Sequence, residues 1–169
     1  MKKIVIYSSL TGNTAKVGHA IAQELGCEAV KFDENFSLNL DEYDFIVVGF
    51  YVDKGDAEPN FKHFLSQIKD KKTGVFMTLG MDPQHEHAAN CLEKVKVVLR
   101  AGGNEILREF YCQGAIDPKI IEQLRKMGET MPNDPRYTIT PEREARWARA
   151  ASHPDENDLE KAKMAFRGI

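Results

Sequence analysis

The sequence predicts an α/β fold, a doubly wound and five-stranded parallel sheet with helices on both faces. Short apolar runs alternate with helical segments along most of the chain, and the last helical segment carries Leu159, Ala162 and Phe166 on one face. Strands that alternate with helices form parallel sheets, because each helix carries the chain back to the same edge. The length of 169 residues suits one domain with a substantial core, so residues 1–169 are expected to form a single unit.

The first strand is expected at Lys3–Tyr7, and the helix after it runs from about Thr14 to Leu25. Glu28–Phe32 forms a weaker strand, whose polar neighbours indicate an edge of the sheet. The continuous apolar run Phe45–Phe50 is instead typical of a central strand that is covered on both faces.

The same alternation continues beyond the central strand. A helix begins at Pro59 and carries apolar residues as far as Ile68. The next strand, Thr73–Leu79, leads to a long helix from about His85 to Ala101. The fifth strand is then expected near Glu105–Cys112.

The chain after the fifth strand admits two interpretations. Either the domain closes near Gly128 and carries a tail, or a final helix at about Glu156–Phe166 covers the fifth strand. We favour the second, because a doubly wound sheet needs a helix after its last strand. Residues 117–152, with a short helix opened by Pro118 and a second helix from Pro141 through Ser152, are then an insertion at the carboxyl end of the fifth strand.

The turn between the first strand and the first helix is the most informative part of the sequence. Its residues are Ser9, Leu10, Thr11, Gly12, Asn13 and Thr14. Unpaired backbone N–H groups and the positive end of the helix dipole meet at such a turn, which predicts an anion site. The absence of lysine favours a phosphate monoester over a nucleoside triphosphate with its metal. The alternative is an ordinary helix cap.

Two further loops are expected at the same edge, where open parallel sheets bind their ligands. One of them contains Phe50, Tyr51, Val52 and Gly55. Tyr51 can stack on a planar heteroaromatic ring, and Gly55 permits its peptide to turn a carbonyl toward that ring. The alternative is a surface turn whose aromatic side chains belong to the core.

The other loop contains Leu79, Gly80 and Met81. Gly80 permits close approach of the backbone, and the thioether of Met81 adapts to irregular surfaces. Backbone donors of this loop could bind the carbonyl and imide edge of a ring. An ordinary connection between strand and helix fits the same residues equally well.

Composition narrows the class of protein. The formal net charge of −3 argues against nucleic acid as a partner. The 3 cysteines form no Cys-x-x-Cys pair, so we interpret them as reduced thiols of a cytosolic protein and expect no metal site. The N-terminal apolar run is too short for a signal sequence or a membrane span, so we expect no membrane insertion and a cytoplasmic location.

The S/T-x-T-G-x-T turn, the two other loops and the strand spacing over residues 1–115 resemble the short-chain flavodoxins. The resemblance implies a flavodoxin-like three-layer sandwich with strand order 2-1-3-4-5, and FMN as cofactor. It places the phosphate on the turn from Ser9 to Thr14 and the ring between the loops of Tyr51 and Gly80. It also implies low-potential electron transfer to or from a partner protein, a reductase or a flavin or iron–sulfur oxidoreductase, with no catalytic side chain.

The sequence departs from the family pattern in two ways. Flavodoxins are usually strongly acidic around the flavin, whereas this chain is nearly neutral. The insertion carries basic and aromatic residues, namely Arg136, Arg143, Arg146, Trp147 and Arg149. We therefore hypothesise that the insertion docks a specific oxidoreductase or screens the flavin edge. The alternative is an amphipathic cover for the edge of the sheet.

Two other functions remain open. The protein could be an FMN-dependent enzyme that accepts hydride from NAD(P)H and reduces a small substrate. It could also be a non-redox module that keeps the fold and binds another phosphorylated ligand.

Overall fold

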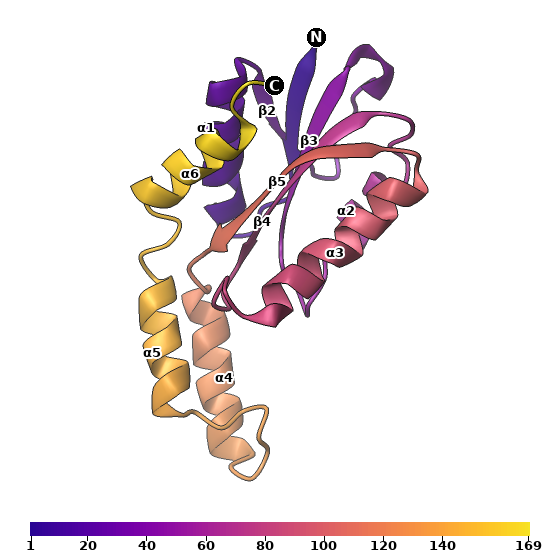
Figure 1. Cartoon of the computed structure of the whole chain (residues 1–169). Coiled ribbons are helices and arrows are strands. Elements are labelled where there is room, and N and C mark those ends of the chain that lie inside the picture. The colour runs from indigo at the N-terminus through magenta and orange to yellow at the C-terminus, as the bar shows by residue number, and fades with distance from the viewer.

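Five parallel strands form the central sheet of the computed structural model, which describes all residues 1–169 (Figure 1). They lie in the order β2-β1-β3-β4-β5, which confirms the predicted fold class. Their bounds are β1 Lys3–Tyr7, β2 Glu28–Lys31, β3 Phe45–Tyr51, β4 Lys72–Leu79 and β5 Glu105–Gln113.

Helices cover both faces of the sheet, and each pair packs together (Figure 1). On one face lie α1 (Asn13–Leu25) and α6 (Glu156–Phe166). On the other face lie α2 (Pro59–Leu65) and α3 (Glu86–Ala101). A short 3₁₀ helix, η1 (Leu40–Glu42), precedes β3.

The apolar side chains divide into one cluster on each face of the sheet. Along β1, Ile4 and Ile6 face α2 and α3, whereas Val5 and Tyr7 face α1 and α6. A strand covered on both faces must be apolar at consecutive positions, and this explains the continuous run in β3. At Gly49 a Cβ would lie 1.9 Å from the ring of Phe76, so only glycine leaves room for that ring to pack against β3.

One helix ends earlier than the sequence predicts. α2 stops at Leu65, because the chain turns at Ser66, whose hydroxyl donates to the carbonyl of His63 over 2.6 Å. Ile68 lies beyond the helix but is fully buried. Its apolar character therefore predicts burial correctly and helical structure wrongly.

Two helices between β5 and α6 project away from the carboxyl edge of the sheet (Figure 1). α4 (Pro118–Thr130) is longer than the short helix expected there, and α5 (Pro141–Ala150) ends two residues before Ser152. We call residues 116–152 the hairpin. At its base the amide of Ala115 donates to the carbonyl of His153 over 2.8 Å, so the two ends of the hairpin lie together.

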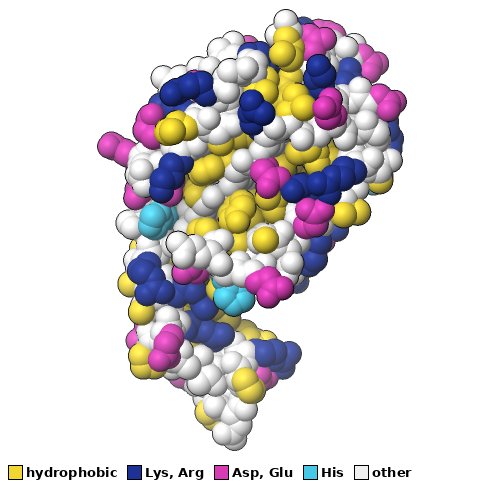
Figure 2. All heavy atoms as spheres, in the orientation of Figure 1, with side chains coloured by type: hydrophobic (Ala, Val, Ile, Leu, Met, Phe, Trp, Pro, Cys, Tyr) yellow, Lys and Arg dark blue, Asp and Glu magenta, His cyan; other side chains and the backbone are white.

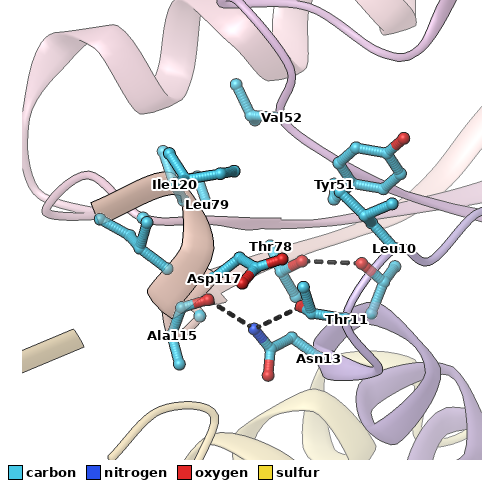
Figure 3. Close-up of a pocket in the computed structure, with 14 residues that line it drawn as sticks. Leu10, Thr11, Asn13, Tyr51, Val52, Thr78, Leu79, Ala115, Asp117 and Ile120 are labelled. Carbon is cyan, nitrogen blue, oxygen red and sulfur yellow. Dashed lines mark hydrogen bonds between the residues drawn. The ribbon is translucent and has the colours of Figure 1, made fainter. Parts of the chain in front are cut away.

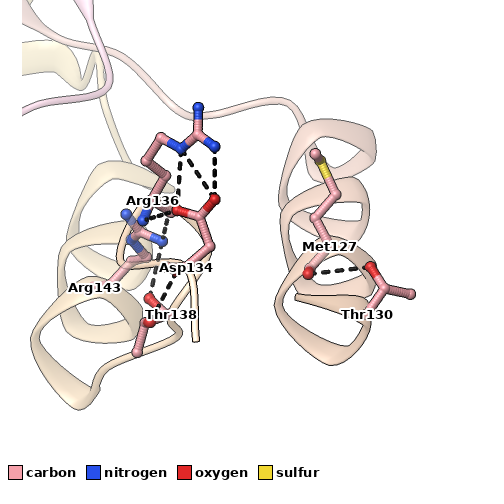
Figure 4. A network of polar contacts seen from close by, with 6 residues as sticks. All are labelled: Met127, Thr130, Asp134, Arg136, Thr138 and Arg143. Atoms are coloured by element: carbon pink, nitrogen blue, oxygen red, sulfur yellow. Dashed lines mark hydrogen bonds and ion pairs between the residues drawn. The ribbon is translucent and has the colours of Figure 1, made fainter. Parts of the chain in front are cut away.

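Contacts within the hairpin hold it together. Arg125 on α4 pairs with Glu144 on α5 at 2.6 Å and lies 5.4 Å from the ring centre of Trp147. At the tip, Arg136 pairs with Asp134 at 2.6 Å, and Arg143 donates to the backbone carbonyls of Arg136 and Thr138 (Figure 4). No residue of α4 is buried.

None of the helices combines the length and the apolar character that crossing a bilayer requires.

Candidate functional site

A pocket of about 120 Å³ lies at the carboxyl edge of the sheet, where loops from four strands meet (Figure 3). The loop after β1 contributes Leu10, Thr11, Asn13 and Thr14, and the end of β3 contributes Tyr51 and Val52. The end of β4 contributes Thr78, Leu79 and Gly80. The segment after β5 contributes Gly114, Ala115, Ile116, Asp117 and Ile120.

The loop after β1 presents backbone donors to this pocket. Gly12 caps α1 with a φ of 97°, a left-handed conformation that glycine adopts without strain. The hydroxyl of Ser9 accepts hydrogen bonds from the amides of Gly12 and Ala15, at 3.2 and 3.3 Å. The amides of Thr11, Asn13 and Thr14 donate no hydrogen bond within the chain. These donors lie at the positive end of the α1 dipole and suit an anion.

Side-chain hydrogen bonds fix the position of this loop. The hydroxyls of Thr14 and Thr78 lie 2.8 Å apart in a buried contact, which joins the first turn of α1 to β4. The side-chain amide of Asn13 donates to the carbonyl of Ala115 over 2.9 Å and to the hydroxyl of Thr11 over 3.3 Å. The donors are therefore held in place by two other segments of the pocket wall.

The opposite side of the pocket is aromatic and apolar. Tyr51 and Val52 lie across the pocket from Asn13 (Figure 3), and the Val52 amide donates to the carbonyl of Thr78 over 3.0 Å. Burial, with the nearby carboxylates of Glu58 and Asp53, raises the pKa of the Tyr51 phenol. The phenol therefore stays neutral at physiological pH, and its ring is a flat, uncharged surface.

The side chain of Phe50 does not reach the pocket, which corrects the expectation that Phe50 lies with Tyr51 in a ligand-binding loop. The Phe50 ring is fully buried in the core on the α2–α3 face. In a continuous apolar strand, successive side chains point to opposite faces, and only Tyr51 at the end of β3 is free to face a ligand.

Gly55 and Met81 line a second hollow of about 230 Å³ next to the pocket. Gly55 sits in a tight turn with Lys54, with φ values of 80° and 49°, closed by two backbone hydrogen bonds between Asp53 and Asp56 at 2.8 and 3.0 Å. The Gly55 carbonyl accepts from the ammonium of Lys94 over 2.8 Å. That carbonyl is therefore already engaged, which opposes the peptide rotation considered from the sequence.

The segment after β5 supplies pocket residues that the sequence analysis did not identify. Ile116 and Ile120 add an apolar wall, and the Asp117 carboxylate points into the pocket (Figure 3). Asp117 also caps α4 by accepting from the amide of Lys119 over 2.8 Å. The only signal for these residues is topological: the carboxyl end of the fifth strand arrives at the edge that the other loops share.

One cluster of potential metal ligands lies elsewhere, at the start of α6. His153, Asp155 and Asp158 bring their ligand atoms within 4.8 Å of one another. Asp155 and Asp158 form a capping box, in which each side chain accepts from the other residue's amide. His153 Nδ1 lies 2.5 Å from an Asp158 carboxylate oxygen. These contacts explain the cluster as the cap of α6.

Known proteins resemble this chain in sequence and in fold. A family model described as a flavodoxin domain matches residues 4–167. The flavodoxin-like domain-containing protein BilS of Clostridioides difficile (strain CD3) is 33% identical over 175 residues, which cover 100% of this chain and 96% of that protein.

Solved structures share the fold at lower identity. Oxidised Flavodoxin 2 from Bacillus cereus has a TM-score of 0.63 and 19% identity, covering 98% of this chain and 97% of that chain. A flavoprotein from Lactobacillus acidophilus NCFM, solved in complex with FMN, has a TM-score of 0.52 and 15% identity over 72% of this chain and 97% of that chain. The family match spans nearly the whole sequence, and the strand order is the one that the resemblance implied. The chain therefore belongs to the flavodoxin family.

Proposed function

We propose that this protein binds FMN in the pocket and passes electrons between FMN and a partner oxidoreductase. The amides of Thr11, Asn13 and Thr14 carry this proposal, because they are held at the start of α1 without a partner in the chain. A phosphate monoester placed there accepts their hydrogen bonds and gains from the helix dipole without a metal. The FMN in the structurally similar Lactobacillus flavoprotein is a further argument.

The rest of the pocket suits the other parts of FMN. Tyr51 offers a neutral ring for stacking, and Leu79 and Val52 offer apolar contacts. Asp117, as a carboxylate, would accept hydrogen bonds from the hydroxyls of the ribityl chain. FMN supplies the redox chemistry when bound, while these residues orient it and exclude water.

We propose two roles for the hairpin, which are docking of the partner and screening of the flavin edge. Ile116 and Ile120 support the screening role, because they line the pocket. α4 and α5 project from the carboxyl edge of the sheet (Figure 1), and the start of α4 lines the pocket, which supports the docking role. The free thiols of Cys27, Cys91 and Cys112 support a cytoplasmic location, where thiols stay reduced.

Cofactor binding is tested by titrating the purified protein with FMN and with riboflavin, which lacks the phosphate, while the visible spectrum is recorded. Three lost hydrogen bonds to a charged group should weaken riboflavin binding at least ~100-fold relative to FMN. Equal affinity for both would contradict the phosphate site. If the protein changes neither the spectrum of FMN nor that of riboflavin, the result would favour the non-redox module.

The docking role is tested by replacing residues 117–152 with two glycines, since the amide of Ala115 and the carbonyl of His153 already lie together. Electron transfer with the natural partner should be lost, while FMN is retained with weaker affinity because Asp117 and Ile120 are gone. The matched control removes only the tip, residues 131–138, and should retain full FMN affinity. Unchanged transfer by the larger deletion would refute docking.

The FMN-dependent reductase is the second candidate, and the hollow beside the pocket favours it. The hollow shares Val52, Leu79, Gly80 and Ile116 with the pocket, so a second molecule bound there would lie against the first. Steady-state oxidation of NAD(P)H by the FMN-loaded protein alone, without an added reductase, would identify this activity. Its absence would leave electron transfer with a protein partner as the function.

A further inference from the structure

The hollow beside the pocket is lined by cationic and apolar side chains and by no carboxylate. Its charged or titratable members are Lys54, His87 and Arg146, which come from the loop after β3, from α3 and from α5. Its apolar members include Leu79, Met81 and Ile116. Figure 2 shows Lys and Arg side chains gathered where the hairpin meets the body of the molecule. Lys54 and Arg146 thus bring positive charge from two separate elements to one concave place, and His87 from α3 lies beside them.

Arg146 lacks the internal partner that Arg125, Arg136 and Arg143 of the hairpin have. Arg125 and Arg136 pair with carboxylates, and Arg143 donates to two backbone carbonyls. The guanidinium of Arg146 makes no ion pair and no hydrogen bond within the chain, although the side chain is half-buried. Burial, together with the charges of Arg143 and Arg149, lowers the pKa of Arg146. A concave, unpaired guanidinium among like charges favours an anion.

Lys54 is the second cation that lines the hollow, and its backbone lies in a tight turn. It occupies a left-handed position, with a φ of 49°, in the tight turn that Asp53 and Asp56 close. Asp56 is already paired with Lys62 at 2.5 Å, and Lys54 makes no ion pair. The turn therefore holds the start of the Lys54 side chain at the hollow, with its charge free for a ligand.

We infer that Arg146 and Lys54, with His87 beside them, bind the carboxylate or phosphate of a small, largely apolar molecule next to the FMN pocket. The apolar lining accepts the body of that molecule, and the volume of about 230 Å³ accommodates a substituted ring. The hollow and the pocket share Val52, Leu79, Gly80 and Ile116, so the bound molecule would lie against the cofactor. This inference rests on the proposed function and adds to it a second ligand, a small apolar anion. The anion site itself does not require FMN.

The test uses 2-naphthoate as the probe and the neutral 2-naphthamide as its uncharged counterpart, titrated into the FMN-loaded protein by calorimetry. Arg146→Gln should weaken 2-naphthoate binding about tenfold or more, because it removes a charge-assisted hydrogen bond. The same change should leave 2-naphthamide binding within a factor of about two. Arg149→Gln is the matched control, since Arg149 lies on the same helix, is exposed and does not line the hollow.

Several results would overturn the inference. The first is that 2-naphthoate does not bind. The second is that Arg149→Gln weakens 2-naphthoate binding as much as Arg146→Gln does. The third is that Arg146→Gln weakens 2-naphthamide binding as much as it weakens 2-naphthoate binding. A fourth is weaker electron transfer with a protein partner in Arg146→Gln without any binding of 2-naphthoate, which would assign the cations to a carboxylate of that partner. Visible spectra of the same samples report FMN binding separately from the binding of 2-naphthoate. Binding of 2-naphthoate to a protein that takes up no FMN would support the anion site and reject the proposed function.

Discussion

The side-chain amide of Asn13 donates a hydrogen bond to the carbonyl of Ala115 over 2.9 Å, across 102 positions of sequence. It joins the loop that begins α1 to the segment that begins the hairpin. The donors proposed for the phosphate and the wall that carries Asp117 are therefore parts of one connected structure. Changes on one side of the pocket should be measurable on the other.

Asn13→Ala should weaken FMN binding roughly five- to tenfold. The substitution removes the hydrogen bond that joins the loop to the segment after β5, and such a bond contributes a net free energy of about 1 kcal/mol. Fluorescence titration with FMN measures the effect. Asn90→Ala, at an exposed position of α3, is the control and should bind FMN as the unaltered protein does. Unchanged affinity in Asn13→Ala would show that the bond does not support the site.

The buried hydroxyls of Thr14 and Thr78 predict a non-additive result in stability. Either single change, Thr14→Val or Thr78→Val, leaves one hydroxyl buried without a partner and should cost about 1–2 kcal/mol. The double variant should cost less than the sum, because both polar groups are removed together. Urea unfolding without FMN measures the cycle. Additive costs would mean that the two hydroxyls do not interact.

Asp56 predicts a pH-dependent contribution to stability. Burial by itself raises the pKa of Asp56, but hydrogen bonds from Lys62 and from the Ala57 amide outweigh it and lower the pKa. A carboxyl with a lowered folded-state pKa stabilises the protein above its unfolded pKa, and that contribution is lost as the pH falls through the folded pKa.

Asp56→Asn should therefore lower the free energy of unfolding by about 0.5 kcal/mol at pH 7, the scale of a partly exposed ion pair. The difference from the unaltered protein should shrink below about pH 4, where the carboxyl becomes protonated. Urea unfolding at several pH values tests this. Asp53→Asn is the control, because the Asp53 side chain makes no ion pair. A difference that grows as the pH falls would contradict the sign.

Cys112 should be the least reactive thiol of the folded protein. Burial, with the charges of Asp158 and Asp155, raises the pKa of Cys112 to about 12. The thiolate is the reactive form, so alkylation at pH 8 should spare Cys112 and modify the half-buried Cys27 first. Mass spectrometry of iodoacetamide-treated protein locates the modified residues. Rapid modification of Cys112 before unfolding would mean that β5 opens readily.

The sheet was predictable because its signals are local. Apolar runs such as Phe45–Phe50 act within a few residues, and the predicted bounds of the strands agree with the structure to within one or two positions. The strand order came from the resemblance to flavodoxins. The extent of α2 was not predictable, because the apolar residue Ile68 is buried in a turn as well as it would be in a helix.

The pocket was predictable in part. The residues between Leu10 and Thr14 that line it stand in one continuous turn with a recognisable spacing. Phe50 was assigned wrongly, because a strand buried on both faces gives no alternation from which to choose a face. Ile116, Asp117 and Ile120 belong to no motif, and only the convergence of distant segments in the fold brings them to the pocket.

The hydrogen bond between the amide of Ala115 and the carbonyl of His153 closes the base of the hairpin. The chain leaves the body of the molecule and returns to it at one point, so the length and composition of what lies between do not change the distance that the framework must span. Insertions or deletions within residues 116–152 should therefore be tolerated by the five-stranded sheet, which receives the chain back at the point where it left.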